Sequence, residues 1–157
     1  MSGVSNPAHI TVAVVVERDG RFLFVEEHTD GDPAQPLVLN QPAGHWDDGE
    51  TLFAGAVRET LEETAWDVEL SALVGIYEYR PAELGYGFLR FAFAAQPLQH
   101  HPQRALDHGI ARAVWLSREE LVAATPRHRS PMVLRCVDDY LAGRRLPLEL
   151  IAHLQAQ

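Results

Sequence analysis

Cysteine and long apolar runs are scarce in this sequence, and each scarcity excludes a class of protein. Cys136 is the only cysteine, so an internal disulfide is ruled out and a reducing cytoplasm is favoured. The longest aliphatic run, at residues 12–16, is far too short to cross a membrane. The opening residues, MSGVSNPAHI, have neither a basic nor an apolar stretch, so we expect no secretory signal.

Basic residues are also in the minority, with 13 against 22 acidic ones and a formal net charge of −9. Such a chain is not expected to bind the phosphate backbone of a nucleic-acid polymer. An anionic small molecule remains a suitable partner, because a bound metal ion inverts the local sign of the charge. We therefore expect a cytoplasmic monomer or homodimer with a small-molecule partner and no membrane contact.

Turn residues and β-rich segments divide the 157 residues into alternating strands and helices. The length suits one domain, so residues 1–157 are interpreted as a single α/β domain with helices on a mixed sheet. Asp19-Gly20 is a favoured hairpin turn, and Ser117 and Ser130 are helix N-cap signals. The expected strands are 9–17, 21–27, 38–41, 68–79, 88–95 and 111–116, the expected helices 51–65, 117–124 and 131–143, and the main loops 30–36, 81–87 and 100–109.

The helix expected at 51–65 is acidic on one side. Because an α-helix advances about 100° per residue, Glu59, Glu62 and Glu63 share an arc of about 100°. Arg58 lies beside this arc, where it can hydrogen-bond to a neighbouring carboxylate. Gly55 falls inside the arc, and its missing side chain leaves room for the preceding loop or a ligand. The opposite side is an apolar stripe that is expected to pack on the sheet: Phe53, Ala54, Val57, Leu61 and Ala65.

Three carboxylates this close repel one another unless a cation compensates their charge. Mg²⁺ prefers oxygen ligands and commonly binds one or two carboxylates together with substrate phosphate. A solvated acidic face is the alternative interpretation, and a Glu-Glu pair alone would favour it. The full pattern of the segment favours the metal ion.

The segment from Gly44 to Trp66 resembles the Nudix box, G-x5-E-x7-R-E-U-x-E-E-x-G-U, in which U is a bulky apolar residue. Its glycine, its glutamates and its arginine are matched by Gly44, Glu50, Arg58, Glu59, Glu62 and Glu63. Two positions depart from the pattern. Thr60 stands where the family has an aliphatic residue, and Ala65 stands where it has the glycine that would supply a left-handed helix end.

Shorter stretches resemble the NudJ-type phosphatase subgroup, among them "NQPAGH", "FLRF", "RSP" and the closing "DDYLAGRRLPLELI". The resemblance implies a Nudix α/β/α sandwich with a mixed β-sheet, a Mg²⁺ or Mn²⁺ cofactor and attack of water on phosphorus. It also implies removal of the terminal phosphate from nucleoside tri- and diphosphates, and cleavage of hydroxymethylpyrimidine pyrophosphate, the thiamine pyrimidine precursor.

The family match assigns roles to the residues of the box. Metal ligation is implied for Glu59, Glu62 and Glu63, with Glu59 and Glu63 the first choices and one of the cluster able to hold the attacking water. Arg58 is interpreted as a residue that orients these carboxylates. Glu50 braces the loop or reaches the metal through water. The backbone carbonyl of Ala43 is a further candidate ligand, and Gly44 and Gly49 allow loop conformations that a bulkier residue would resist.

Outside the box, further candidates are weighed against simpler interpretations. Asp107 is a candidate acidic residue of the site or a turn residue. Arg127 and Arg129 are candidate phosphate ligands or solvated loop residues. Arg90 is an unusual charge in an apolar strand, facing the substrate cleft or lying at a sheet edge. Three other candidates are expected to serve packing or loops: Trp46 and Tyr86, which could stack on a base, and the pair His100-His101.

The sequence therefore predicts a metal-dependent Nudix hydrolase that acts on small diphosphate or triphosphate esters. A pyrophosphohydrolase that sanitises the nucleotide pool keeps this chemistry but cleaves a different bond. A Nudix-fold module that senses a nucleotide without cleaving it is the rival from another class. A degenerate box would favour the sensor. Here every carboxylate of the box and Arg58 are present, which favours the enzyme.

Overall fold

Strand β1, at Ala8–Arg18, is the centre of the sheet, as the computed structural model of residues 7–155 shows. It pairs in parallel with β6 (Gly87–His100), antiparallel with β4 (Ala43–His45) and, through its last two residues, antiparallel with β2 (Arg21–His28). Residues 1–6, on which the expectation of no secretory signal partly rests, lie outside the described residues.

The remaining strands extend this sheet on both sides of β1. β5 (Trp66–Tyr79) pairs with β6, and β3 (Leu37–Asn40) and β7 (Ile110–Leu116) pair with β2, all antiparallel. The strand order is β3-β2-β1-β6-β5; outside this order, β4 pairs with β1 and β7 pairs with β2. Asp19 and Gly20, with φ of 52° and 75°, form the expected hairpin turn. The predicted mixed sheet is confirmed.

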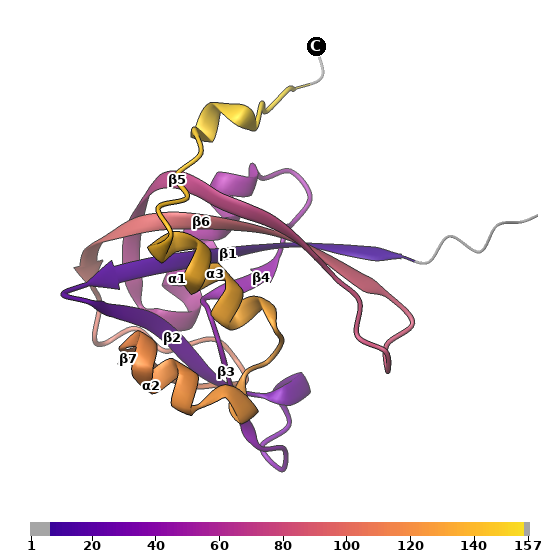
Figure 1. Cartoon of the computed structure of the whole chain (residues 1–157), viewed down its shortest axis with the longest axis vertical. Coiled ribbons are helices and arrows are strands. Elements are labelled where there is room, and N and C mark those ends of the chain that lie inside the picture. The colour runs from indigo at the N-terminus through magenta and orange to yellow at the C-terminus, as the bar shows by residue number, and fades with distance from the viewer. Residues whose placement is uncertain (1–6, 156–157) are drawn as a thin grey trace, which may run out of the picture.

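Helices cover both faces of the sheet, as Figure 1 shows, with α3 in front and α1 behind. Alternation along β1 supplies two cores: Ala13 and Val15 face α3 (Met132–Leu141), while Val12 and Val14 belong to the core that α1 (Leu52–Thr64) covers. A shorter helix, α2 (Arg118–Ala123), lies with α3. Single 3₁₀ turns occur at Thr29–Gly31, Thr125–Arg127 and Leu148–Leu150. The arrangement confirms the expected α/β/α sandwich.

Several local expectations hold, and a few do not. Ser117 caps α2 in a full capping box with Glu120, as predicted. Ser130 lies one residue before the N-cap of α3, Pro131, and its hydroxyl accepts a bond from the Met132 N–H at 3.2 Å. The glycine loop before α1 contains the unpredicted strand β4. Strand β6 extends to His100, which was predicted to be the first residue of a loop. The strand is longer because β5 pairs with β6 along the whole length of β5.

The predicted packing side of α1 is only partly right. Its buried residues are Gly55, Ala56, Thr60, Glu63 and Thr64, whereas Phe53 and Val57 are partly buried and Ala54 is exposed. The buried threonines are tolerated because each donates its hydroxyl to the carbonyl four residues earlier, Thr60 at 2.8 Å and Thr64 at 2.6 Å. Small side chains let the helix approach the sheet closely, and this brings Glu63 inside the protein.

No helix in the described part of the chain is long and apolar enough to span a membrane. Cys136, on α3, is a buried free thiol.

Candidate active site

The loop before α1 is held by its own residues. Thr51 caps α1 by accepting the Ala54 N–H at 3.0 Å. The carboxylate of Glu50 accepts the Asp47 N–H at 3.0 Å, and the indole of Trp46 donates to the Glu50 carbonyl at 2.7 Å. Trp46 thus braces the loop, in agreement with its simpler interpretation.

Arg58 is the cation at the centre of the acidic arc. It donates two bonds to Glu50, at 2.7 and 3.0 Å, and one each to Glu59 at 3.0 Å and Glu62 at 3.2 Å. A further ion pair reaches Asp47 at 3.1 Å. Hydrogen bonds from Arg58 hold the pKa of the Glu50 carboxyl below its ordinary value, and the pKa of Arg58 itself is raised. These bonds to Glu50, Glu59 and Glu62 are the contacts that the predicted role of Arg58, orienting the carboxylates, requires.

Two glycines make room for these carboxylates. A Cβ atom on Gly44 would overlap the carboxylate of Glu59, and one on Gly55 would lie 2.7 Å from Glu50 Oε1. The preceding loop therefore occupies the space that Gly55 leaves, one of the two expected occupants. Gly49 adopts a φ of 85°, a left-handed conformation that glycine tolerates. Ala65 adopts the left-handed helix end despite its side chain, with φ of 60° and its N–H bonded to Leu61.

Strand β4 presents its free edge to α1. The backbone carbonyl of Pro42 and the backbone N–H of Trp46, which flank β4, hydrogen-bond to β1. Because such bonds alternate along an antiparallel strand, the N–H and C=O groups of Ala43 and His45 point away from β1. The Ala43 N–H donates to Glu63 Oε1 at 2.8 Å, and the His45 carbonyl accepts from Arg58 at 3.3 Å. The Ala43 carbonyl lies on the same edge, as its proposed role as a ligand requires.

Burial and like charges perturb the acidic cluster. Glu63 is only 6% exposed. Its burial, together with repulsion from Glu27, Glu59 and Asp107, raises its pKa to about 9, although the hydrogen bond from the Ala43 N–H acts in the opposite direction. Burial also raises the pKa of Glu59 and that of Glu27. Clusters of carboxyls with raised pKa values are characteristic of sites that bind cations or move protons.

The carboxylates of α1 suit a divalent cation. Glu59, Glu62 and Glu63 each use one oxygen for Arg58 or Ala43, and within residues 7–155 no protein donor bonds to the other oxygen. Hard divalent cations bind such carboxylate oxygens as ligands, together with a backbone carbonyl oxygen. No three His, Cys, Asp or Glu side chains of the described residues are already gathered as a metal site. Two of these carboxylates, those of Glu59 and Glu62, point to Arg58.

The structure separates the remaining candidates. Asp107 lies beside the cluster, with its N–H bonded to the Glu62 carbonyl at 2.9 Å. Arg129 and Arg90 both line a cavity next to β4. Arg127 instead forms an ion pair with Glu26 at 2.7 Å and is absent from the residues that line the cavity. The histidine pair serves packing, His100 stacking on Trp66 and His101 pairing with Asp67.

The cavity has a volume of about 410 Å³, and Ala43 and Gly44 are among the residues that line it. Sequence reasoning missed several residues that line it, notably Glu27, Asn40 and Thr11. Asn40 lies in the stretch "NQPAGH", but that stretch was used only as evidence of similarity to the subgroup and not to assign a role to Asn40. Glu27 follows Glu26 near the end of β2, and no sequence pattern distinguishes which of the two faces the site.

Two known proteins are similar to this chain over most of its length. The NUDIX domain family model matches residues 7–135. Phosphatase NudJ of Escherichia coli strain K12 is 38% identical over 143 residues, which cover 91% of this chain and 90% of the relative. A NUDIX hydrolase from Nitrosomonas europaea is 40% identical with a TM-score of 0.90, covering 94% of this chain and 98% of that one.

A more distant structure, a UDP-X diphosphatase, supports the fold alone. It is 14% identical with a TM-score of 0.69, and the match covers 92% of this chain and 68% of that one. The family model and the relative from Escherichia coli therefore show the family, and the similar structures agree with it in fold. The chain belongs to the Nudix family and is a hydrolase that acts on phosphoanhydride bonds.

Proposed function

We propose that this Nudix hydrolase depends on Mg²⁺ or Mn²⁺ and removes the terminal phosphate from nucleoside tri- and diphosphates and from small pyrophosphates. Hydroxymethylpyrimidine pyrophosphate is one such substrate. The observation that carries the proposal is the set of three α1 carboxylates, each with one oxygen that no donor of the described residues binds, beside a cavity that can hold the rest of the substrate. The similarity to Phosphatase NudJ supports terminal cleavage.

The proposed roles follow the geometry. Glu59 and Glu63 hold the metal, together with the Ala43 carbonyl, and Glu62 is a third ligand or holds the attacking water as general base. A bound divalent metal neutralises phosphate oxygens and lowers the pKa of water, which is most of what phosphoryl transfer to water requires. Arg58 keeps the carboxylates in place, and Glu50 fixes Arg58 with two hydrogen bonds.

Metal binding should stabilise the fold, because a cation relieves the repulsion within the buried acidic cluster. We expect millimolar Mg²⁺ to raise the melting temperature, and EDTA to abolish hydrolysis. Scanning fluorimetry at constant ionic strength measures the first effect, and phosphate release measures the second. Glu59→Gln should reduce the thermal shift, whereas the control Glu69→Gln, an exposed residue on β5, should keep it. Undiminished turnover after metal stripping in EDTA would contradict the mechanism.

The products decide which bond is cleaved. Incubation with GTP should release orthophosphate and form GDP, and GDP should itself be hydrolysed. Phosphorus NMR or ion-exchange chromatography identifies the products. Release of pyrophosphate and GMP from GTP, with GDP left intact, would reject terminal cleavage and identify a pyrophosphohydrolase instead.

We also propose that the enzyme works in the cytoplasm on small molecules, as a monomer or homodimer. The single cysteine, Cys136, supports a reducing compartment, since it is free and buried.

A further inference from the structure

Strand β4 has one face toward α1 and the other toward the core that contains α3. Gly44 faces α1, because a Cβ atom on it would overlap the Glu59 carboxylate. Side chains alternate along a strand, so those of Ala43 and His45 point to the opposite face. Ala43 packs there on the core that includes α3 residues, and His45 is exposed and lines the cavity. A shift of this short strand would therefore move groups on both faces at once.

Two hydrogen bonds join the backbone of β4 to the acidic cluster. The Ala43 N–H donates to Glu63 Oε1 at 2.8 Å, and the His45 carbonyl accepts from Arg58 Nη2 at 3.3 Å. The Ala43 carbonyl, a proposed metal ligand, lies between these two groups in the chain. The position of β4 thus decides where this carbonyl lies relative to the carboxylates of α1.

The side chain of His45 is bound to that of His9. Nδ1 of His9 and Nε2 of His45 are 2.8 Å apart, so one ring donates an N–H···N hydrogen bond and the other accepts it. The ring centroids are 5.1 Å apart, a separation at which the two nitrogens point directly at each other. The bond is therefore short and well aligned.

His9 is a firmly held partner for this bond. It lies on β1, opposite Phe88 in the register of β1 and β6. Its ring stacks on Tyr86, with 4.2 Å between the centroids and 22° between the planes. The start of β1 and the hairpin between β5 and β6 meet in this way at the right of Figure 1. A side chain whose rotamer is fixed by packing is suited to hold a neighbouring group in place.

We propose that His9 is a positioning residue of this hydrolase, which holds β4 in place against α1 by binding the His45 ring. The bond keeps the backbone of β4 in contact with Glu63 and Arg58. His9 touches neither the metal ion nor the substrate and acts through His45 alone. The consequence for turnover rests on the proposed function, whereas the effect on β4 does not.

Two substitutions of His9 separate the hydrogen bond from the stacking. His9→Asn loses the ring but places a polar atom where Nδ1 lies, so a partner for His45 remains. His9→Phe keeps a ring for Tyr86, suits a strand and loses the bond. With GDP and saturating Mg²⁺, we expect His9→Phe to lower the turnover number about 3- to 10-fold, which is the worth of one neutral hydrogen bond. His9→Asn should stay within about twofold of the wild type.

Turnover of His9→Phe equal to that of the wild type would overturn the proposal. A loss in His9→Asn as large as that in His9→Phe, or larger, would also overturn it, because the stacking and not the bond would then matter. The matched control is His100→Phe, which replaces another exposed histidine that stacks on an aromatic ring, Trp66. It should keep wild-type turnover.

Hydrogen exchange at the Ala43 amide tests the effect on β4 without catalysis. NMR of the metal-free protein in EDTA measures it, and His9→Phe should speed this exchange about 3- to 10-fold. The amide of Leu121, bonded to the Ser117 carbonyl in α2, should keep its rate. Unchanged exchange at Ala43, or equal acceleration at both amides, would overturn the proposal whatever the turnover. Absence of hydrolysis by the wild type with Mg²⁺ would reject the proposed function alone.

A double-mutant cycle tests whether His9 acts through His45. His45→Leu removes the other partner of the bond. If the two residues act through this one bond, adding His9→Phe to His45→Leu should change turnover and Ala43 exchange by less than about twofold. Fully additive effects would show that His9 acts by another route and would overturn the proposal.

Discussion

Replacing Glu63 by glutamine is expected to lower the turnover number by roughly 10²- to 10⁴-fold, since it removes a proposed metal ligand or base from the reaction centre. The side chain keeps its size, and its oxygen can still accept the Ala43 N–H that Glu63 accepts at 2.8 Å. What is lost is the ability to ionise and so to bind the cation. Steady-state kinetics with GDP and saturating Mg²⁺ measure the change.

The same substitution should not destabilise the metal-free protein. Burial raises the pKa of Glu63 from 4.5 to about 9, so the folded state binds a proton that the unfolded state releases. Wild-type stability should therefore fall as the pH rises from about 4.5 toward 9. Glutamine cannot ionise, so Glu63→Gln should remove this decline and be at least as stable as the wild type at pH 7. Urea unfolding in EDTA at several pH values measures the difference.

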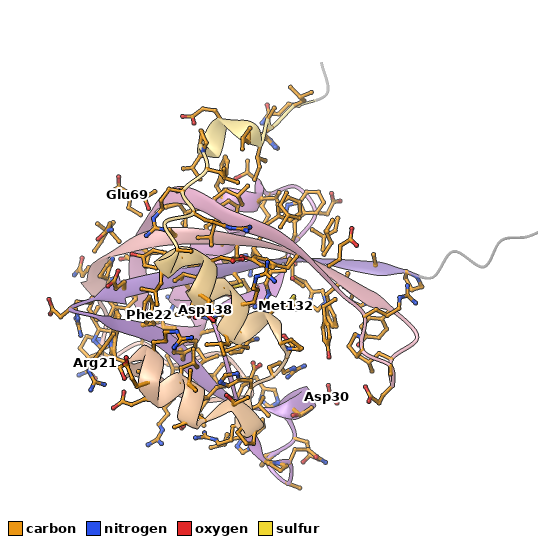
Figure 2. The ribbon with its side chains drawn as sticks, viewed as in Figure 1. Arg21, Phe22, Asp30, Glu69, Met132 and Asp138 are labelled. Atoms are coloured by element: carbon orange, nitrogen blue, oxygen red, sulfur yellow. The ribbon has the colours of Figure 1, made fainter. Side chains whose placement is uncertain are left out.

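Glu69→Gln is the control for both effects, because Glu69 is exposed on β5, at the upper left of Figure 2. It should leave turnover and the pH dependence of unfolding unchanged. Near-normal turnover of Glu63→Gln in Mg²⁺ would show that the reactive face of α1 has been assigned wrongly.

Gly44→Ala is expected to reduce turnover by roughly 10²-fold without unfolding the chain, since a misplaced group in an active site costs about this much. Gly44 does not have a positive φ, so alanine is not strained there. The added methyl group would overlap the Glu59 carboxylate, which lies at the end of a flexible side chain and must move. Glu59 would then leave its bond with Arg58 and the position from which it is proposed to hold the metal.

A double-mutant cycle tests whether the effect passes through Glu59. If alanine at position 44 acts by displacing that carboxylate, adding it to Glu59→Gln should cost little more activity. Fully additive losses of activity would mean that Gly44 acts through the conformation of its own loop and not through Glu59. Gly85→Ala is a suitable control, because nothing lies within 4 Å of the added atom and its backbone is unstrained. It should retain wild-type turnover.

Local rules explain which features could be predicted from the sequence. Helix periodicity placed Glu59, Glu62 and Glu63 on one arc beside Arg58, and the structure joins two of these glutamates to Arg58. The Asp19-Gly20 turn and the Ser117 cap depend only on neighbouring residues, and both are observed. These features were predictable because the groups that determine them lie within a few residues of one another.

Contacts between distant segments decided the rest. Ala65 adopts a left-handed helix end that its own preference opposes, because the buried junction between α1 and β5 holds it there. Arg127 and Arg129 are two residues apart, yet one pairs with Glu26 and the other lines the cavity.

The cavity itself depends on tertiary structure in the same way. Arg90 becomes a buried, amide-bound cation only when β6 pairs with β1 and brings it beside Thr11 and Asn40. Its surroundings come from residues tens of positions apart, so no local pattern in the sequence encodes them. The sequence by itself determined the acidic helix and its family. Strand pairing and helix packing determined which residues complete the site, because burial and charge compensation arise only when these segments meet.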